Sequence, residues 1–501
     1  MLSTTNPTTG VTTDAGIVLT SDAELEAITT AAAAAAVELA RHDREWRAAL
    51  LESMAEALEE RRTELVDVAR EETGLGDPRL NGELSRTVFQ LRLFAEAVRE
   101  GGFLEAMIDH AGDTPLGPGP DVRRLLIPVG PVAVFGSSNF PFAFSVPGGD
   151  TASALAAGNP VVMKAHSAHL LTSRLSFEAL RAGAERAGAP AGTVGIVYGQ
   201  SAGAALVAHP AIRAVGFTGS LGAAQRLQQI IDGREIPIPL YGELQSVNPV
   251  IVTAGALAAN SETLAAGLAG SVTGSGGQLC TKPGLVFLPE GELGDQFAES
   301  LAVAIGAQPP HVLLGERVHE NFERVRAELQ AANGVTELAR GESGGHGYSS
   351  AAAVLSVGIA DFAADHTEEA FGPLVVLVRY SDVAQIEAGL RVVPGSLTAT
   401  IHAAADETEL TAHLAELVAP IAGRLLFGGF PTGVRVSWAQ HHGGPWPATN
   451  SLHTSVGVTA IRRFLRPMVW QDAPEAVLPV ELREGNRSVP RRVDGVLQLA
   501  E

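Results

Sequence analysis

Short apolar runs that alternate with helical segments limit the fold of this chain more than any other feature. Runs expected as strands cover residues 132–135, 160–164, 194–198 and 214–217. Segments with apolar residues at helical spacing lie between them, at 149–157, 170–187 and 201–208. Strands that alternate with helices form a parallel sheet with helices on both faces. Ligands of such sheets bind beyond the carboxyl ends of the strands.

A second alternation of the same kind begins after residue 243. Strands are expected at 248–253 and 285–288, with a helix at 262–272 between them, and further units continue to about residue 424. Ahead of the first sheet, residues 1–20 are predicted as a loose leader. Ser21-Asp22-Ala23-Glu24 is a capping-box pattern that opens a run of helices. The chain is therefore expected to be an α/β protein with two sheets.

Two further segments fit neither sheet. Residues 105–130 resemble a hairpin around the turn cluster Gly117-Pro118-Gly119-Pro120, with little apolar material of its own. The C-terminal residues 470–501 become strand-like near 489–499. We expect both to form a small β element used in assembly, as a homodimer or a homotetramer, with residues 431–469 bridging back to the domains.

Composition excludes several classes of partner. The 501 residues carry a formal net charge of −21, so nucleic acid and anionic membranes repel the chain. A single cysteine forms no internal disulfide and builds no multi-thiolate metal site. The first residues lack the basic and apolar regions of a secretion signal, and no apolar run is long enough to span a bilayer. We expect a cytoplasmic protein with no metal, no nucleic-acid partner and no membrane partner.

The single cysteine, Cys280, follows the run Gly274-Ser275-Gly276-Gly277 and precedes Thr281-Lys282. Glycines allow close approach of a ligand, and a neighbouring cation favours the nucleophilic thiolate. Taken alone, a lone cysteine is more often a small buried hydrophobe, at roughly two to one. The rest of the chain decides between the two interpretations.

Three polar stretches follow predicted strands of the first sheet. Asn139 could donate its amide to a developing oxyanion, and Lys164 could bind a phosphate or a ribose hydroxyl. Phe217-Thr218-Gly219-Ser220 opens a helix whose N-terminus suits a pyrophosphate. Each has an ordinary alternative: a turn asparagine, a strand-end lysine in water and a simple helix start.

Two carboxylates complete the candidates. Glu243, in Tyr241-Gly242-Glu243, could act as a general base that activates water, or could be an exposed loop residue. The loop Glu369-Ala370-Phe371-Gly372-Pro373 could hold a ligand with its carboxylate and ring, or could be an ordinary turn.

In succession these stretches resemble the aldehyde dehydrogenase superfamily, from about residue 20 to 470. Four pieces are similar to the 2-oxoglutarate semialdehyde (2,5-dioxovalerate) dehydrogenase branch. They are residues 136–145, Lys164-Ala165-His166, Phe430-Pro431-Thr432-Gly433-Val434 and His442-Gly443-Gly444-Pro445. The resemblance implies a Rossmann-like dinucleotide-binding domain (1–104 and 131–243), a catalytic domain (244–430) and a small β oligomerisation element (105–130 and 470–501).

The resemblance also assigns roles. Cys280 is implied as the nucleophile that forms a thiohemiacetal and then a thioester. Asn139 and the Cys280 backbone N–H are implied to hold the oxyanion, and Glu243 to activate the hydrolytic water. The implied cofactor contacts are Lys164 with the adenosine ribose, Ser220 with the pyrophosphate, Glu369 with the nicotinamide ribose, and Phe371 beside the nicotinamide ring.

Departures from the family pattern bear on the cofactor. Ser167 stands where many NAD-using members have a glutamate that holds the ribose hydroxyls, with His166 beside it. Without that carboxylate a 2′-phosphate is not repelled, which favours NADP over NAD. Gln245 and Ala224 stand where glycine is common in the family.

Three other functions are alternatives. A CoA-acylating dehydrogenase usually lacks the water-activating glutamate, which Glu243 supplies. A catalytically silent nucleotide-binding relative conflicts with retention of Cys280, Glu243 and Asn139. A cysteine hydrolase would need one of the 14 histidines, none in a motif position to pair with Cys280, although distant pairing stays open. The branch resemblance implies an aldehyde substrate that carries a carboxylate at its far end. That carboxylate would need a cation near the pocket, for which Arg174 and Arg435 are candidates by location alone.

Overall fold

Five parallel strands form the first sheet, in the order β11–β10–β7–β8–β9. Their bounds are β7 Val132–Phe135, β8 Val161–Lys164, β9 Val194–Val197, β10 Ala214–Thr218 and β11 Leu240–Glu243. The helices between them are α5 Gly149–Ala157, α6 Leu170–Arg186, α7 Gln200–Ala208 and α8 Leu221–Asp232. The computed structural model describes residues 1–431 and 433–501. The alternation expected from the sequence is confirmed for all four of its strands.

The register of this sheet aligns the ends of its strands. Phe135 lies opposite both Lys164 and Phe217, and Thr218 lies opposite Glu243. Segments that follow β7, β8, β10 and β11 therefore leave the sheet at one edge. That edge is where ligands of parallel sheets bind.

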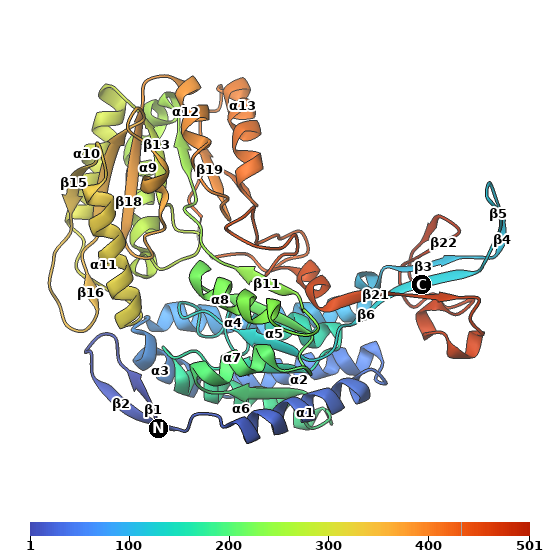
Figure 1. Cartoon of the computed structure of the whole chain (residues 1–501). Coiled ribbons are helices and arrows are strands. Elements are labelled where there is room, and N and C mark those ends of the chain that lie inside the picture. Colours follow the sequence, from blue (N-terminus) through green and yellow to red (C-terminus); the bar gives the residue numbers. More distant parts are fainter. Residues whose placement is uncertain (432) are drawn as a thin grey trace.

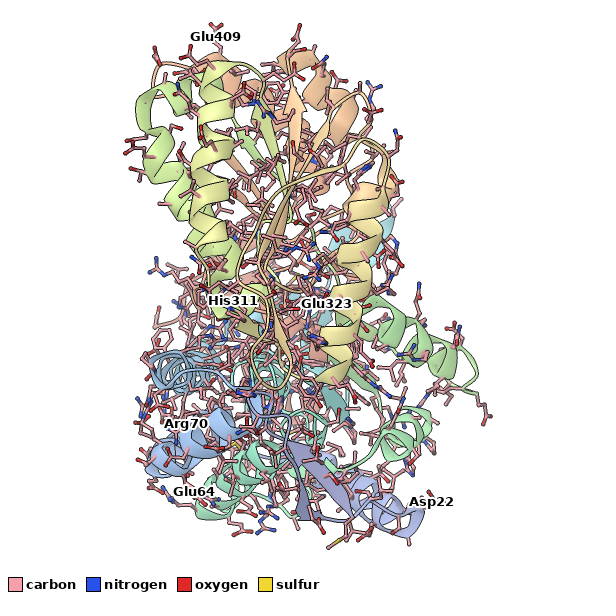
Figure 2. The ribbon with its side chains drawn as sticks, turned by 90° about the vertical axis from the view of Figure 1, so that its left-hand side faces the viewer. Asp22, Glu64, Arg70, His311, Glu323 and Glu409 are labelled. Atoms are coloured by element: carbon pink, nitrogen blue, oxygen red, sulfur yellow. The ribbon has the colours of Figure 1, made fainter. Side chains whose placement is uncertain are left out.

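Four helices precede the sheet: α1 Asp22–Leu39, α2 Arg44–Glu60, α3 Arg62–Thr73 and α4 Asp77–Glu100. The predicted capping box is present, because Ser21 accepts from Glu24 N–H and the Glu24 side chain accepts from Ser21 N–H. Leu50, Met54 and Leu58 recur at helical spacing on α2 and are fully buried in the main core. Acidic side chains such as Glu64 on α3 lie on the outer surface (Figure 2).

The second sheet has seven strands, in the order β15–β17–β18–β13–β12–β19–β20. Only β15 runs antiparallel to its neighbour among the strands described. The strands are β12 Val250–Val252, β13 Leu285–Pro289, β15 Thr336–Arg340, β17 Ala353–Gly358, β18 Leu374–Tyr380, β19 Ala399–His402 and β20 Leu425–Phe427. The helices are α9 Ala254–Thr273, α10 Glu292–Gly306, α11 Glu316–Ala331, α12 Val383–Leu390 and α13 Thr408–Val418. Separate apolar clusters cover its two faces.

A third sheet projects from the body as an arm (Figure 1), in the order β21–β6–β3–β22–β23. It comprises β3 Ala106–Asp109, β6 Val122–Pro128, β21 Leu465–Gln471, β22 Arg491–Val493 and β23 Val496–Gln498, with a tip made of β4 Gly112–Thr114 and β5 Gly117–Gly119. Two details differ from expectation. Strand β21 begins at Leu465, inside the range 431–469 that was expected to bridge back to the domains, because it pairs with the whole of β6. Gly117–Gly119 is a strand, and the turn precedes it.

The expected loose leader is wrong, because the first residues form a hairpin of β1 Leu2–Thr5 and β2 Thr12–Ile17. Thr4 Oγ1 donates to the buried Glu72 carboxylate at 2.7 Å. Tyr348 N–H, beside the short pair β14 His311–Val312 and β16 Ser349–Ser350, donates to Pro7 O at 2.9 Å. The hairpin thus joins the two halves of the chain (Figure 1). No helix in the described part of the chain has the length and apolarity to cross a membrane.

Candidate active site

The cysteine loop is held in place by a glycine and an asparagine. A 3-10 turn, Gly274–Gly277, ends α9 and leads to Cys280. Gly277 has φ +68°, and a Cβ there would lie 2.3 Å from the backbone of Gly372. Only glycine lets the cysteine loop approach this closely. Asn248 Nδ2 donates to Cys280 O at 2.8 Å and to Lys282 O at 3.0 Å, which fixes the turn that carries the sulfur.

Four side chains, that of Cys280 included, form one group of contacts around the sulfur. The partly buried Cys280 Sγ lies 3.5 Å from His442 Nε2, and His442 Nε2 lies 2.9 Å from Glu243 Oε1. Ser455 Oγ donates to the other carboxylate oxygen of Glu243 at 2.7 Å. An ionised carboxylate only accepts hydrogen bonds, so the proton on this edge of the imidazole is assigned to Nε2. The same N–H faces both the carboxylate and the sulfur.

The electrostatics of this group oppose a free thiolate. Burial, the charge of Glu243 and a hydrogen bond to Glu243 raise the pKa of Cys280 well above its usual range. Burial also acts to raise the pKa of Glu243, but the charge of His442 and hydrogen bonds from His442 and Ser455 outweigh it and lower that pKa to about 2. Near neutral pH the pair is therefore a thiol beside a carboxylate, and the sulfur must lose its proton when it reacts.

Asn139 lies on the other side of the cysteine loop, and its Nδ2 donates to Gln278 O at 2.9 Å. Helix α4 holds the segment that carries it. Arg79 Nη2 donates to Asn139 O at 3.2 Å. The buried Glu83 carboxylate accepts from Phe142 N–H at 2.7 Å and from Ala143 N–H at 2.8 Å. The structure thus brings Asn139, Cys280 and Glu243 to one place.

The residues expected to hold the adenosine half of a dinucleotide lie at the ends of β8 and β10. Lys164 ends β8, and burial lowers its pKa to about 8. Within residues 1–431 and 433–501 its ammonium group has no carboxylate within 4.0 Å. Ser167 is exposed just beyond it, and Ser220 is the exposed N-cap of α8 with no side-chain capping bond. A free ammonium and an open helix N-terminus fit the phosphates of a dinucleotide.

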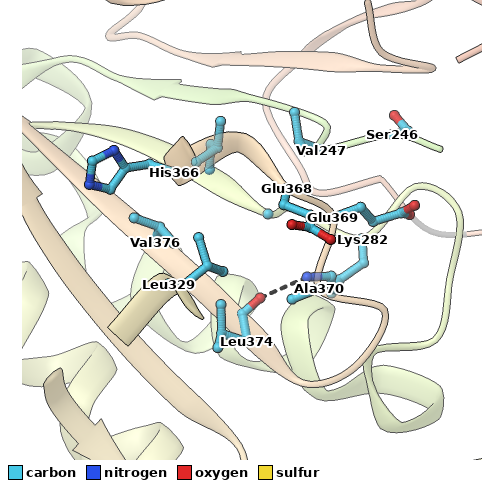
Figure 3. Close-up of a pocket in the computed structure, with 12 residues that line it drawn as sticks. Ser246, Val247, Lys282, Leu329, His366, Glu368, Glu369, Ala370, Leu374 and Val376 are labelled. Atoms are coloured by element: carbon cyan, nitrogen blue, oxygen red, sulfur yellow. Dashed lines mark hydrogen bonds between the residues drawn. The ribbon is translucent and has the colours of Figure 1, made fainter. Parts of the chain in front are cut away.

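Glu369 and Phe371 lie in the loop that Gly277 contacts. Lys282 is buried, and its Nζ donates to Leu374 O at 2.7 Å (Figure 3). Burial raises the pKa of Glu369 to about 8, and the charge of Lys282 acts against that rise. Burial lowers the pKa of Lys282 to about 8, and the charge of Glu369 acts against that fall. Lys282 therefore connects the cysteine loop to the Glu369 loop and counters its carboxylate.

Comparison with known proteins identifies the family of the chain. The model of the aldehyde dehydrogenase family matches residues 1–415. The chain belongs to the aldehyde dehydrogenase family. It is an oxidoreductase that acts on an aldehyde and uses a nicotinamide cofactor.

This aldehyde dehydrogenase is similar to proteins that carry more specific names. Alpha-ketoglutaric semialdehyde dehydrogenase 2 of Azospirillum brasilense is 46% identical over 457 residues, which covers 90% of this chain and 87% of the relative. Alpha-ketoglutaric semialdehyde dehydrogenase of Acinetobacter baylyi is 41% identical over 495 residues, which covers 96% of this chain and 93% of the relative. The structure of the NADP-dependent glyceraldehyde-3-phosphate dehydrogenase of Bacillus halodurans, solved with NADP, superposes with a TM-score of 0.78. The superposition covers 94% of this chain and 96% of the other, and at 23% identity it supports the fold alone.

The two positions where glycine is common in the family, Gln245 and Ala224, have separate surroundings. Gln245 lines a cavity of about 620 Å³ together with Glu328, Glu368 and Pro394. Ala224 is buried in the apolar cluster between α8 and the first sheet. Thr432, part of one branch-like piece, lies outside the described residues.

The two arginines considered for the substrate have no contact with Cys280, His442 or Glu243 among the hydrogen bonds and ion pairs of the described residues. Arg174 is 40% exposed, with its closest carboxylate on Glu178, one turn along α6. Arg435 is exposed.

Sequence reasoning missed His442 as a partner of Cys280. The histidine pairing left open for a cysteine hydrolase exists in this aldehyde dehydrogenase, 162 positions away from the sulfur. A signal was available, because His442 opens the branch-like piece His442-Gly443-Gly444-Pro445. Ser455 and Glu83 carried no comparable signal.

Three side chains of this group could also ligate a metal ion. Glu243, Cys280 and His442 each offer one ligand atom, all within 4.8 Å of one another. Carboxylate, thiolate and imidazole are donors that Zn²⁺ accepts. The expectation that the site holds no metal therefore stays a prediction.

Proposed function

We propose that this aldehyde dehydrogenase oxidises 2-oxoglutarate semialdehyde (2,5-dioxopentanoate) to 2-oxoglutarate. The observation that carries the chemistry is the meeting of Cys280, His442 and Glu243 within hydrogen-bond reach, with Asn139 beside the same loop. The substrate is supported by the two relatives at 46% and 41% identity, both named for it. Glu243 argues against a CoA-acylating relative, because a water-activating carboxylate is present.

Each residue has a role that follows from its position. The Cys280 thiol loses its proton to solvent water as the sulfur attacks the aldehyde carbon, and the Nε2–H of His442 stabilises the sulfur as it becomes negative. Asn139 Nδ2 and the Cys280 backbone N–H donate to the oxygen that becomes negative when sulfur attacks the aldehyde carbon. The nicotinamide cofactor, when bound, supplies the oxidising power that converts this adduct into a thioester. Glu243 then takes a proton from the water that releases the acid.

The same proposal extends to the cofactor. Lys164, Ser167 and Ser220 hold the adenosine half, with NADP favoured because Ser167 adds no negative charge against a 2′-phosphate. Glu369 and Phe371 hold the nicotinamide half. The ranges 1–104 with 131–243 form the dinucleotide-binding domain, and 244–430 the catalytic domain.

Assembly and location complete the proposal. The arm exposes apolar side chains, among them Leu116, Val469 and Leu497, which supports a homodimer or homotetramer formed through it. A free catalytic thiol needs a reducing compartment, which supports a cytoplasmic location.

The test is the initial rate of reduced-cofactor formation with 2-oxoglutarate semialdehyde, measured with NADP and NAD in parallel. We expect turnover with both and a higher kcat/KM with NADP. A higher kcat/KM with NAD would contradict the argument from Ser167 but leave the chemistry standing. If the enzyme oxidised simple aldehydes but not the semialdehyde, the proposed substrate would be wrong.

Lys282 gives a prediction about pH. Replacing Lys282 by methionine removes the positive charge that opposes the rise in the pKa of Glu369, so that pKa should move further above about 8. Less Glu369 is then ionised at pH 7, and the apparent KM for NADP should rise about three- to tenfold, since one pKa unit corresponds to a factor of ten. Raising the pH should restore a lower KM in Lys282→Met. Glu369→Gln is the control, in which this pH dependence should be absent; identical KM–pH profiles for Lys282→Met and the wild type would refute the coupling.

A further inference from the structure

Arg86, on α4, has a guanidinium group with one donor left unused. Its Nε donates to Val434 O at 3.1 Å, and its Nη1 donates to Gln90 Oε1 at 3.4 Å. Its Nη2 is buried and has no partner within residues 1–431 and 433–501. The guanidinium carbon lies 5.0 Å from the centre of the Phe144 ring. Two bonds and an aromatic face thus hold the group in one orientation.

Two other arginines of this region have carboxylate partners. Arg79 pairs with Glu83 at 2.6 Å, and Arg463 pairs with Asp150 at 2.8 Å. No described carboxylate lies within 4.0 Å of Arg86. A buried cation without a counter-ion is costly, and the cost is recovered when an anion binds. Arg86 is therefore prepared for an anion that the chain itself does not provide.

The position of Arg86 connects it to the reacting sulfur. Phe144, beneath the guanidinium, lies 6.1 Å from the ring of His442, which in turn contacts Cys280. Phe144 belongs to an apolar cluster that includes Val434 and against which Leu279, the residue before Cys280, packs. Burial lowers the pKa of Arg86, whereas the negative charges that Glu83, Cys280 and Glu243 can carry raise it. The guanidinium is thus near the site but separated from the sulfur by an apolar wall.

A second unused donor lies beside the first. Gln90 Nε2 is buried without a partner among the described residues, and its amide oxygen is the one that Arg86 contacts. A Cβ built at Gly149 would lie 2.8 Å from Gln90 Nε2 and 3.1 Å from Ser455 O. Gln90 therefore sits next to the segment that holds Glu243.

We propose that Arg86 binds the free carboxylate of the substrate, with Gln90 as its neighbour, and so selects aldehydes that carry a carboxylate at the far end. This inference rests on the proposed function, because it names the residue that recognises its substrate class. The apolar wall of Phe144 and Leu279 accommodates the methylene groups between the aldehyde and the acid. Arg86 thus takes the role of carboxylate-binding cation, for which the sequence offered Arg174 and Arg435.

The first experiment compares Arg86→Met and the wild type on two five-carbon aldehydes, 2-oxoglutarate semialdehyde and uncharged pentanal. Loss of a charge-assisted hydrogen bond should lower kcat/KM for the semialdehyde about 10- to 100-fold more than for pentanal. Arg86→Lys, which keeps the charge, should recover part of the difference. Arg424→Met is the matched control, because Arg424 is a second partly buried guanidinium, whose pKa burial lowers and the charge of Cys280 acts to raise. It should change kcat/KM for both substrates by the same factor. Equal losses on both substrates in Arg86→Met, or a selective loss in Arg424→Met, would overturn the assignment.

A second experiment separates this inference from the proposed function. Glutarate is added as an inhibitor of pentanal oxidation by the wild type and by Arg86→Met, with thermal unfolding to verify that both are folded. We expect inhibition of the wild type and an inhibition constant at least about tenfold weaker in the variant. This result would support a carboxylate site even if the wild type failed to oxidise the semialdehyde. Equal inhibition of both proteins would refute the role of Arg86, whatever the natural substrate is.

Discussion

Replacing Cys280 by serine is expected to abolish aldehyde oxidation, with a loss of roughly 10⁴-fold or more in kcat. A hydroxyl is far less acidic than a thiol and is a weak nucleophile without a strong base. Here the available base is Glu243, whose pKa is about 2, so it cannot compensate. The measurement is steady-state formation of reduced cofactor from 2-oxoglutarate semialdehyde and from pentanal.

The single cysteine makes the control for this variant unambiguous. Iodoacetamide should modify one thiol per chain in the wild type, inactivate it in proportion, and leave Cys280→Ser unmodified. The variant should unfold at the wild-type temperature and still bind NADP, because the sulfur makes no contact with Lys164 or Ser220. Retention of a tenth of the wild-type rate by a folded variant would eliminate Cys280 as the nucleophile.

The fold was largely predictable because local patterns encode it. The runs at 132–135, 161–164 and 194–197 are fully apolar or nearly so, and each is bounded by glycine, proline or a polar turn. Such runs form buried parallel strands regardless of what lies far away in the chain. The N-terminal hairpin could not be recognised in this way, because β2 is Thr12–Ile17, mostly exposed and polar. Its stability comes from contacts with Glu72 and Tyr348, which sequence patterns do not reveal.

The candidate site, like the fold, could be predicted from the sequence only in part. Asn139 follows an expected strand and Cys280 follows a glycine turn, so their positions can be inferred from the sheet edge, whereas Glu243, the last residue of the unexpected strand β11, was inferred from motif order alone. His442 lies 199 positions from Glu243, in an irregular segment with no periodicity to read. Arg86 occupies a regular helix in which any arginine would be expected to face water. Only the tertiary packing shows that its guanidinium is buried beside Phe144.

Replacing Glu243 by glutamine is expected to separate oxidation from hydrolysis. The amide keeps the size of the side chain but cannot take a proton from water, so the thioester should accumulate on Cys280. Rapid mixing should show a burst of reduced cofactor, at most one equivalent per chain, followed by turnover about 100- to 1,000-fold slower than in the wild type.

Ser455→Ala is the matched control for Glu243→Gln, since Ser455 donates the bond at 2.7 Å to the same carboxylate but does not itself take a proton from water. Removing that bond should let the pKa of Glu243 rise from about 2, because the bond stabilises the ionised form. A carboxylate with a higher pKa is a stronger base, so Ser455→Ala should keep turnover within about tenfold of the wild type and show no burst. If Glu243→Gln instead slowed the first turnover as much as the later ones, Glu243 would act before the thioester forms, and hydrolysis would depend on His442.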